Sequence, residues 1–267
     1  MRSSYPCLLL CVCLGVACVV GVCVWNAQWR GGFAWDGSGQ QFNWHPVLMV
    51  SGLVVLYGYG AVLYRVPLTW DGDKRPWKLL HGGLMLASLV LSVVGLSAVF
   101  QVHAGKGIPA LYSVHSWVGL GTVVLFATQW VVGVLVFLLP CSPVSLRVVL
   151  KPVHVWLGTS ILSLSVAACI SGITENLIFH LNEVNGTQYV TLPPEALFAN
   201  SLGVLILLFV LVVLRILSNR SWERPEPGLS QGAAYRPLLQ EQRMKGQKKK
   251  KRAVLFHTRY FFSYLVV

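Results

Sequence analysis

The sequence predicts an all-α membrane protein with six transmembrane helices. Of its 267 residues, 55% are apolar and only 11% are charged, whereas about 25% of the residues in a soluble domain are charged. Six apolar runs reach roughly the ~20 residues that a helix needs to span a bilayer. Four consecutive runs also place one histidine near an end, although imidazole in hydrocarbon is costly unless it is paired or bound to a metal.

The six expected spans are separated by joints that are polar or contain prolines. Residues 5–25 are longer than the apolar core of a cleaved signal peptide, so we interpret them as the first helix. The other expected spans are 45–65, 79–100, 113–138, 153–174 and 197–217. Together they define a transmembrane domain over residues 1–218, followed by a tail over residues 219–267 that we expect to be disordered and cytosolic.

Basic residues are unevenly divided between the two sides of this arrangement. In or next to the joints 66–78 and 140–152, one side carries Arg65, Lys74, Arg75, Lys78, Arg147 and Lys151. Because cytosolic loops of membrane proteins are enriched in Lys and Arg, these joints and both termini are expected in the cytosol. The Asn-Gly-Thr sequon at Asn185 then falls in the last non-cytosolic joint, where it is a predicted glycosylation site.

Charge and cysteine content argue against two other classes of protein. The formal net charge of +12 does not indicate nucleic-acid binding, because much of it lies in the tail and the body has no basic groove interleaved with aromatic residues. Most of the seven cysteines lie in the first apolar run, without the CxxC or CxxCH spacing of a zinc site or a covalently attached haem. We expect them to fill a helix interface.

The four histidines are expected to form two pairs. His45 and His115 fall at the non-cytosolic ends of their helices, 70 residues apart, and His81 and His154 fall at the cytosolic ends, 73 residues apart. Each separation corresponds to two helices and two joints. We interpret the pairs as axial ligands of two haems, held in a four-helix dihaem core of helices two to five with helices one and six on its flanks. An iron with two histidine ligands has no open coordination position, which suits electron transfer.

Other interpretations of the histidines remain open. They could be hydrogen-bonded residues near the membrane surface, in which case the protein is a non-redox transporter or scaffold. Zinc is disfavoured, because two histidines per site are too few without cysteine or carboxylate ligands. A dihaem quinone oxidoreductase is also disfavoured, since such proteins commonly place two histidines on one helix, whereas each helix here offers one.

Five segments carry a family resemblance: FNWHPV (42–47), KLLHG (78–82), LYSVHSW (111–117), RVVLKPVH (147–154) and SWERP (221–225). With them the chain resembles the cytochrome b561 family over about residues 5–230. One further segment, RGGFAW (30–35), and the form LKPVH (150–154) within the fourth segment are similar to the lysosomal branch of that family.

The resemblance implies a transmembrane ascorbate-dependent ferrireductase with two non-covalent haem b groups. It assigns His45 and His115 to a lumenal haem, and His81 and His154 to a cytosolic haem. Cytosolic ascorbate is the implied donor, and lumenal Fe(III) or monodehydroascorbate is the implied acceptor, with cupric ion as an alternative on the same route. The resemblance also implies a homodimer. Together with a Tyr-x-x-apolar motif at Tyr235, it implies a location in the membranes of late endosomes and lysosomes.

On the cytosolic side, the resemblance assigns roles to several basic residues. Ascorbate is a monoanion at neutral pH, so a cationic site is expected beside the cytosolic haem. Lys74, Lys78 and Arg147 match the family's ascorbate-binding positions, and Arg65 matches its partner for a haem propionate. The chain departs from the family at Glu223, where a lysine is usual.

On the lumenal side, Tyr112, Ser113 and Glu175 match residues that contact the haem in the family. His103 matches a candidate site for the acceptor, and Fe(III) is compatible with imidazole and carboxylate ligands. Residues 244–267 match nothing expected in the family, and their run of basic residues could bind anionic membrane lipid.

Overall fold

The computed structural model describes residues 5–70, 72–183 and 188–224. Regular structure in these residues is helical throughout, and six helical segments are long and apolar enough to cross a membrane, which confirms the predicted fold class. The predicted glycosylation site Asn185, the sorting motif at Tyr235 and the basic run of the tail lie outside the described residues.

The first span is α1 (Tyr5–Trp29). The second span, Gly39–Arg65, joins five short elements: α2 (Gly39–Phe42), α3 (Trp44–Met49), the π-helix η1 (Val50–Leu56), α4 (Tyr57–Val62) and the 3-10 helix η2 (Leu63–Arg65). The other spans are α5 (Arg75–Lys106), α6 (Val114–Gly133) with the π-helix η4 (Val134–Leu138), α7 (Val144–Glu183) and α8 (Pro194–Ser218). The joints contain the 3-10 helices η3 (Pro67–Thr69), η5 (Tyr189–Thr191) and η6 (Arg220–Trp222).

Helices α5 and α7 extend beyond the apolar stretches that mark them in the sequence. They contain 32 and 40 residues, because hydropathy detects only the part of a helix that faces lipid, whereas the backbone hydrogen bonds continue into the polar ends. α5 ends where Gly107 adopts the left-handed conformation, with φ of 67°, which favours glycine at a helix C-terminus. α6 begins after Ser113, whose hydroxyl accepts a hydrogen bond from the backbone N–H of Ser116 in a capping box.

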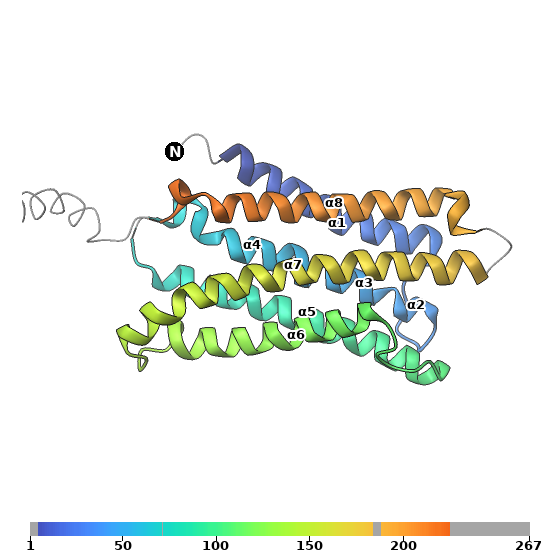
Figure 1. Ribbon diagram of the computed structural model, residues 1–267, viewed down its shortest axis with the longest axis horizontal. Coiled ribbons are helices and arrows are strands. Elements are labelled where there is room, and N and C mark those ends of the chain that lie inside the picture. Colours follow the sequence, from blue (N-terminus) through green and yellow to red (C-terminus); the bar gives the residue numbers. More distant parts are fainter. Residues whose placement is uncertain (1–4, 71, 184–187, 225–267) are drawn as a thin grey trace, which may run out of the picture. The chain divides into compact units, whose positions relative to one another are not determined.

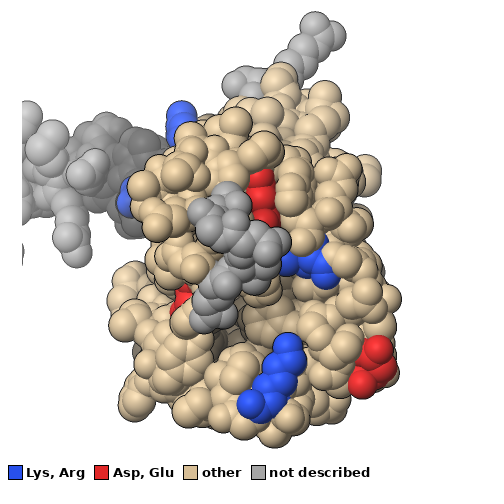
Figure 2. All heavy atoms as spheres, turned by 90° about the vertical axis from the view of Figure 1, so that its right-hand side faces the viewer, with Lys and Arg blue, Asp and Glu red and all other residues tan. Residues whose placement is uncertain are grey.

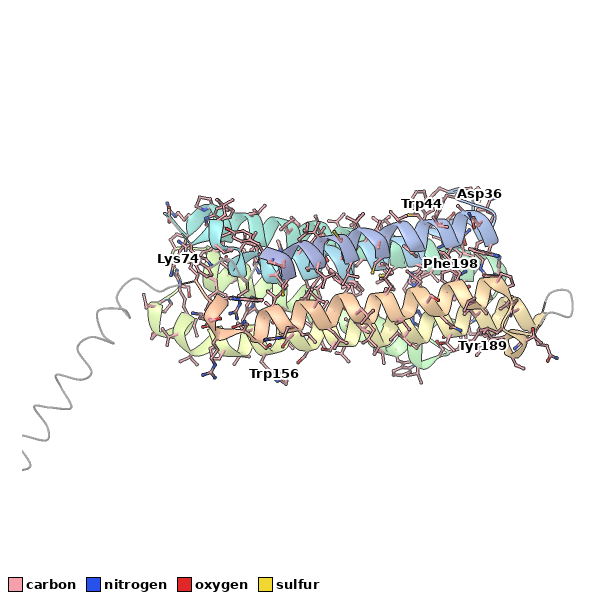
Figure 3. The ribbon with its side chains drawn as sticks, turned by 90° about the horizontal axis from the view of Figure 1, so that it is seen from above. Asp36, Trp44, Lys74, Trp156, Tyr189 and Phe198 are labelled. Carbon is pink, nitrogen blue, oxygen red and sulfur yellow. The ribbon has the colours of Figure 1, made fainter. Side chains whose placement is uncertain are left out.

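The six spans alternate in direction along the bundle (Figure 1). In the view from above, Lys74 and Trp156 lie toward one end of the bundle and Trp44 lies toward the other (Figure 3). We call these the His81 end and the His45 end, because His81 follows Lys74 by two helical turns and His45 is next to Trp44. Histidines from alternate spans therefore lie at the same end.

The second span is the most enclosed of the six. In its most apolar stretch 61% of the residues are buried, against 22–39% in the other spans, and it packs against α1, α5, α7 and α8. Glycines permit this close packing: a Cβ on Gly52 would lie 2.9 Å from the carbonyl oxygen of Ser88 in α5, and one on Gly58 would lie 2.8 Å from the ring of Phe209 in α8. The Ser88 hydroxyl donates to Gly52 O at 2.7 Å, which satisfies a carbonyl inside the π-helix η1.

The outward faces of the helices are apolar. Large side chains such as Leu86 and Val90 in α5, and Val124 and Val131 in α6, are exposed in the isolated chain. Since the interior of a bilayer is hydrocarbon, we expect these faces to contact lipid. Polar and ionisable side chains that are buried within the bundle are then the ones to examine for function.

Candidate functional site

The structure brings the four histidines together in the two expected pairs. His45 of α3 and His115 of α6 have ring centroids 6.0 Å apart and ring planes at 88°. His81 of α5 and His154 of α7 have centroids 6.4 Å apart and ring planes at 70°. All four side chains are half-buried. One imidazole pair therefore lies at each end of the bundle.

The separation of the rings fits a metal atom between them. A metal bound to the nitrogens of two opposed imidazoles lies about 2 Å from each nitrogen, which sets the ring centroids about 6 Å apart. Among the described residues, no group of three or more His, Cys, Asp or Glu side chains is placed to hold a metal ion. A metal at either pair would therefore take its remaining ligands from a non-protein group, and the ring nitrogens of a haem meet that need.

Backbone carbonyls orient three of the four rings. Because a carbonyl oxygen only accepts hydrogen bonds, Nδ1 carries the proton in each of these bonds, and Nε2 presents its lone pair to a metal. The bonds run from His45 to Gly95 O (3.1 Å), from His81 to Gly60 O (2.9 Å) and from His115 to Ala168 O (2.8 Å).

Two of these carbonyl anchors link the second span and α5 reciprocally. The second span supplies His45 and also Gly60, the anchor of His81, while α5 supplies His81 and also Gly95, the anchor of His45. In α5 the histidine and the anchor are fourteen residues apart, and α7 has the same spacing between its histidine and its anchor. Fourteen residues of helix correspond to about 21 Å. Each of these helices therefore reaches from one site to the other.

A glycine leaves room for one of the rings. A Cβ at Gly172 in α7 would lie 2.6 Å from Cε1 and 2.9 Å from Nδ1 of His115, closer than side chains normally approach. At the other pair, a Cβ on Gly133 would lie 3.4 Å from Cε1 of His154, which is close to an ordinary contact. The position of His115 therefore depends on the absence of a side chain at Gly172.

A cavity of about 980 Å³ lies at the His45 end and is lined by His45 and His115. Its walls also include Arg30, His103 and Glu175. Figure 2 looks onto this end of the bundle and shows a hollow bordered by basic and acidic side chains. The volume falls in the range of about 300–1,000 Å³ that is typical of small-molecule and cofactor sites.

The four residues predicted for this side line the same cavity. The hydroxyl of Tyr112 donates to Glu175 Oε1 at 2.7 Å, and burial together with this hydrogen bond raises the pKa of Tyr112. The ring of His103 stacks on Phe42, with centroids 6.2 Å apart and planes at 16°. Ser113 is the N-cap of α6, so it fixes the start of the helix that carries His115.

At the His81 end, two of the predicted ascorbate-binding residues bind the end of the fourth span. Lys78 Nζ donates to Phe137 O at 3.1 Å, and Arg147 donates from Nε and Nη2 to two further carbonyls of that turn, at 3.1 and 2.9 Å. Carbonyls at a helix C-terminus carry partial negative charge and hold nearby cations. Lys78 has three donors and Arg147 has five, so further donors remain for an anion. Lys74 is the N-cap residue of α5, one turn before Lys78.

Arg65 contacts the end of α8. Its guanidinium donates to Leu217 O at 2.7 Å and to Asn219 O at 3.0 Å, and it lies 3.3 Å from Glu223 Oε1. Sequence reasoning missed these contacts, and it treated Glu223 only as a departure from the family. In the structure Glu223 supplies an anion for Arg65. A contact of Arg65 with a haem propionate stays a prediction.

A buried ion pair that sequence reasoning also missed joins α8 to the end of α1. Arg30 Nη2 lies 2.5 Å from Glu195 Oε1, and the two side chains are 7% and 9% exposed. Trp25 Nε1 donates to the same oxygen at 2.8 Å, and the Arg30 guanidinium lies over the Trp25 ring. Burial lowers the pKa of Arg30, and the carboxylate of Glu195 opposes this effect. The signal in the sequence was a glutamate at the start of an apolar span, which needs a partner if it is buried.

Fold and site together define a multi-pass helical membrane protein with two histidine pairs that fit haem. A family model for eukaryotic cytochrome b561 matches residues 44–180, a range that includes all four histidines. The chain belongs to the cytochrome b561 family, whose members bind haem. The family resemblance found in the sequence is thereby confirmed.

Relatives match over most of the chain. The lysosomal membrane ascorbate-dependent ferrireductase of Danio rerio is 60% identical over 232 residues, which cover 86% of this chain and 94% of the relative. Its counterpart from Homo sapiens is 54% identical over 228 residues, 85% of this chain and 93% of the relative. The plasma membrane ascorbate-dependent reductase of Xenopus laevis is 44% identical over 224 residues, 84% of this chain and 78% of the relative.

Proposed function

We propose that this protein is a transmembrane ascorbate-dependent ferrireductase of late endosomes and lysosomes. In this function, electrons pass from cytosolic ascorbate at the His81 end to lumenal Fe(III) at the His45 end. The observation that carries the proposal is the presence of one imidazole pair at each end of the bundle. The second span and α5 each contribute to both sites, with a histidine at one and a carbonyl anchor at the other. The similarity to relatives named as ascorbate-dependent ferrireductases supports this choice of reaction.

The two histidine pairs would hold two non-covalent haem b groups, one between His45 and His115 and one between His81 and His154. When bound, a haem supplies a reversible one-electron carrier. With two imidazoles of the chain bound to its iron, each haem would have no open position for oxygen. Rings whose Nδ1–H is already bound to a carbonyl keep their orientation, which favours rapid electron transfer without rearrangement of the ligands.

Lys78 and Arg147 form the proposed ascorbate site, with Lys74 beside it. The ascorbate monoanion gives up one electron to the protein and one proton to water, and becomes monodehydroascorbate. A cationic site attracts this anion, and the carbonyl contacts of Lys78 and Arg147 hold the two cations in place before the donor binds.

The proposed acceptor site is the cavity at the His45 end. His103 and Glu175 line it and offer an imidazole and a carboxylate, ligands that iron ions accept. The hydroxyl of Tyr112 holds the carboxylate of Glu175 in position. There Fe(III) takes up one electron and leaves as Fe(II).

The proposed orientation follows from charge. The joints at the His81 end carry most of the basic residues outside the tail, and cytosolic loops are enriched in such residues. The described residues contain an even number of spans, so the two ends of the bundle's chain fall on the same side, and we propose that both termini lie in the cytosol. In line with the family resemblance, we propose that the protein works as a homodimer within membrane lipid.

Purification and reconstitution test the proposal. We expect the protein purified in detergent to contain two low-spin haem b groups per chain by haem quantitation and reduced-minus-oxidised spectra. In vesicles loaded with ascorbate, molecules whose His81 end faces inward should form Fe(II) from an external ferric chelate. Parallel reactions with an external cupric chelate and with monodehydroascorbate rank the acceptors.

Two results would contradict the proposed function. A correctly folded protein without colour would favour the non-redox transporter or scaffold, in which the histidines serve protons or packing. A protein with only one haem per chain would lack an electron carrier at one end of the bundle, and electron transfer across the membrane would then need a different route.

A further inference from the structure

Arg30 borders the cavity at the His45 end with hydrogen-bond donors that no described residue uses. Its side chain is 7% exposed, and it lines the same cavity as His45 and His115. Nη2 lies close to Glu195 Oε1, but neither Nε nor Nη2 makes a hydrogen bond of acceptable geometry within the described part of the chain. The carboxylate oxygen is hydrogen-bonded by Trp25 Nε1 instead.

A buried guanidinium with unused donors is an incomplete site. Arginine stays protonated in proteins, so the charge and its five N–H groups persist. A buried charged donor without a hydrogen-bond partner is costly, more so than a neutral one. Glu195 neutralises the charge through one oxygen that it shares with Trp25. The planar fork of a guanidinium matches both oxygens of a carboxylate, so a carboxylate other than that of Glu195 would satisfy these donors.

We infer that Arg30 binds a propionate of the haem held between His45 and His115, and thereby positions that haem. The inference rests on the proposed function, since it requires a haem at this pair. A haem carries carboxylates at one edge of its ring, and the cavity extends from the two imidazoles to Arg30. Lys106 also lines the cavity, but it is exposed and surrounded by solvent. Arg30 is thus a positioning residue as well as part of the link between α1 and α8.

A buried positive charge at a propionate favours the reduced haem, which carries one more negative charge than the oxidised haem. We expect Arg30→Gln to make reduction of this haem about tenfold less favourable, which for one electron is about 59 mV. The propionate, having lost its partner, should also take up a proton at higher pH, so the midpoint potential should become more dependent on pH. Glu195→Gln removes the opposing negative charge and should shift the potential upward.

The test uses the purified holoprotein with its haems. Midpoint potentials of both haems are measured by spectroelectrochemical titration at several pH values, and the propionate bending modes are followed by resonance Raman spectroscopy. Arg30→Gln should shift the potential and the propionate modes of one haem only. Arg30→Lys, which keeps the charge but lacks the fork, should give a smaller shift in potential with altered propionate modes. Lys106→Gln is the matched control, and its exposed charge should have a smaller effect because solvent screens it.

Three results would overturn the inference. The first is an Arg30→Gln protein that keeps both haems with unchanged potentials and propionate modes. The second is an equal shift in Lys106→Gln, which would indicate a general effect of charge. The third is an Arg30→Lys protein with unchanged propionate modes, which would contradict a bidentate contact. This variant decides the question even if Arg30→Gln does not fold.

An alternative source of the carboxylate that binds Arg30 is the electron acceptor, for example a ferric citrate complex. In that case Arg30→Gln would raise the KM for ferric citrate but not for ferricyanide, with both potentials unchanged, and the assignment to a propionate would be wrong. A protein that lacks a haem at this pair contradicts the proposed function and the inference together. A protein with two haems and unshifted potentials contradicts the inference alone.

Discussion

The two histidine pairs have similar geometry but different surroundings. Their ring centroids are 6.0 and 6.4 Å apart, and both pairs combine imidazoles from alternate spans. The pair at the His45 end borders a cavity whose walls include Arg30 and Glu175. The pair at the His81 end lies beside aromatic rings, with Tyr64 and Phe137 centroids 5.6 and 5.1 Å from the nearest imidazole centroids, and its cations are bound to carbonyls.

This difference in surroundings separates two properties of each site: the kind of group that it holds and the partner that approaches it. Under the proposed function, the imidazole pairs determine what kind of group is held, and both ends have such a pair, with two anchored rings at the His45 end and one at the His81 end. The charges and the cavity determine which partner approaches, and they differ. Under the proposed function, fixed cations at the surface suffice for an anionic donor, whereas a metal complex needs a cavity with imidazole and carboxylate groups.

The largest effect is expected from removing a ligand at either end. Under the proposed function, His45→Ala and His81→Ala should each lose one of the two haems, because each variant removes one of the two imidazoles that would hold that haem. Both variants should abolish Fe(II) formation across vesicles, but only His45→Ala should keep a haem that ascorbate reduces quickly. Haem-to-protein ratios and stopped-flow spectra measure this. Rapid reduction of His81→Ala by ascorbate would contradict the proposal that the donor site lies at the His81 end and the acceptor site at the His45 end.

An intermediate effect is expected at one end from the glycine beside His115. In Gly172→Ala the new Cβ would lie 2.6 Å from His115 Cε1, so the ring has to move away from its carbonyl anchor, and this haem should be lost or become partly high-spin. Gly133→Ala is the matched control, since its Cβ would lie 3.4 Å from His154 Cε1. Alanine stabilises a helix by about 1 kcal/mol relative to glycine, so both variants should fold. Equal haem spectra in the two variants would show that the sites tolerate a side chain equally.

The smallest effect is expected at the donor site. Lys78→Met should raise the KM for ascorbate about tenfold, the loss of one charge-assisted contact of ~1.4 kcal/mol, with little change in kcat and in haem content. Arg75→Gln removes an exposed charge from the same helix end and serves as the control. Steady-state reduction of the haems at varied ascorbate concentration measures KM and kcat for both variants. An unchanged KM in Lys78→Met would place the donor elsewhere at the His81 end.

Sequence patterns predicted the features that depend on local composition. Hydropathy gave six spans, and their alternation placed the histidines in pairs. The carbonyl anchors could not be predicted, because every residue has a carbonyl and its partner depends on how the helices pack. Arg30 looked like an ordinary basic residue at a membrane edge, and the family resemblance assigned Arg65 to a haem propionate and not to a partner within the chain. Their partners Glu195 and Glu223 are far away in the sequence, 165 and 158 residues on, and become neighbours only in the folded bundle.

The reciprocal anchoring of the second span and α5 has a consequence for how the protein can evolve. If α5 moved by one residue relative to its neighbour, its side chains would turn by about 100°, and this shift would take His81 from one site and the Gly95 carbonyl from the other. Under the proposed function, the tunnelling distance between the two irons is therefore set by the register of the helices, and neither site can shift alone. Insertions and deletions between a histidine and its anchor should be absent from working variants, while reduction potentials remain adjustable through side chains around the ligands.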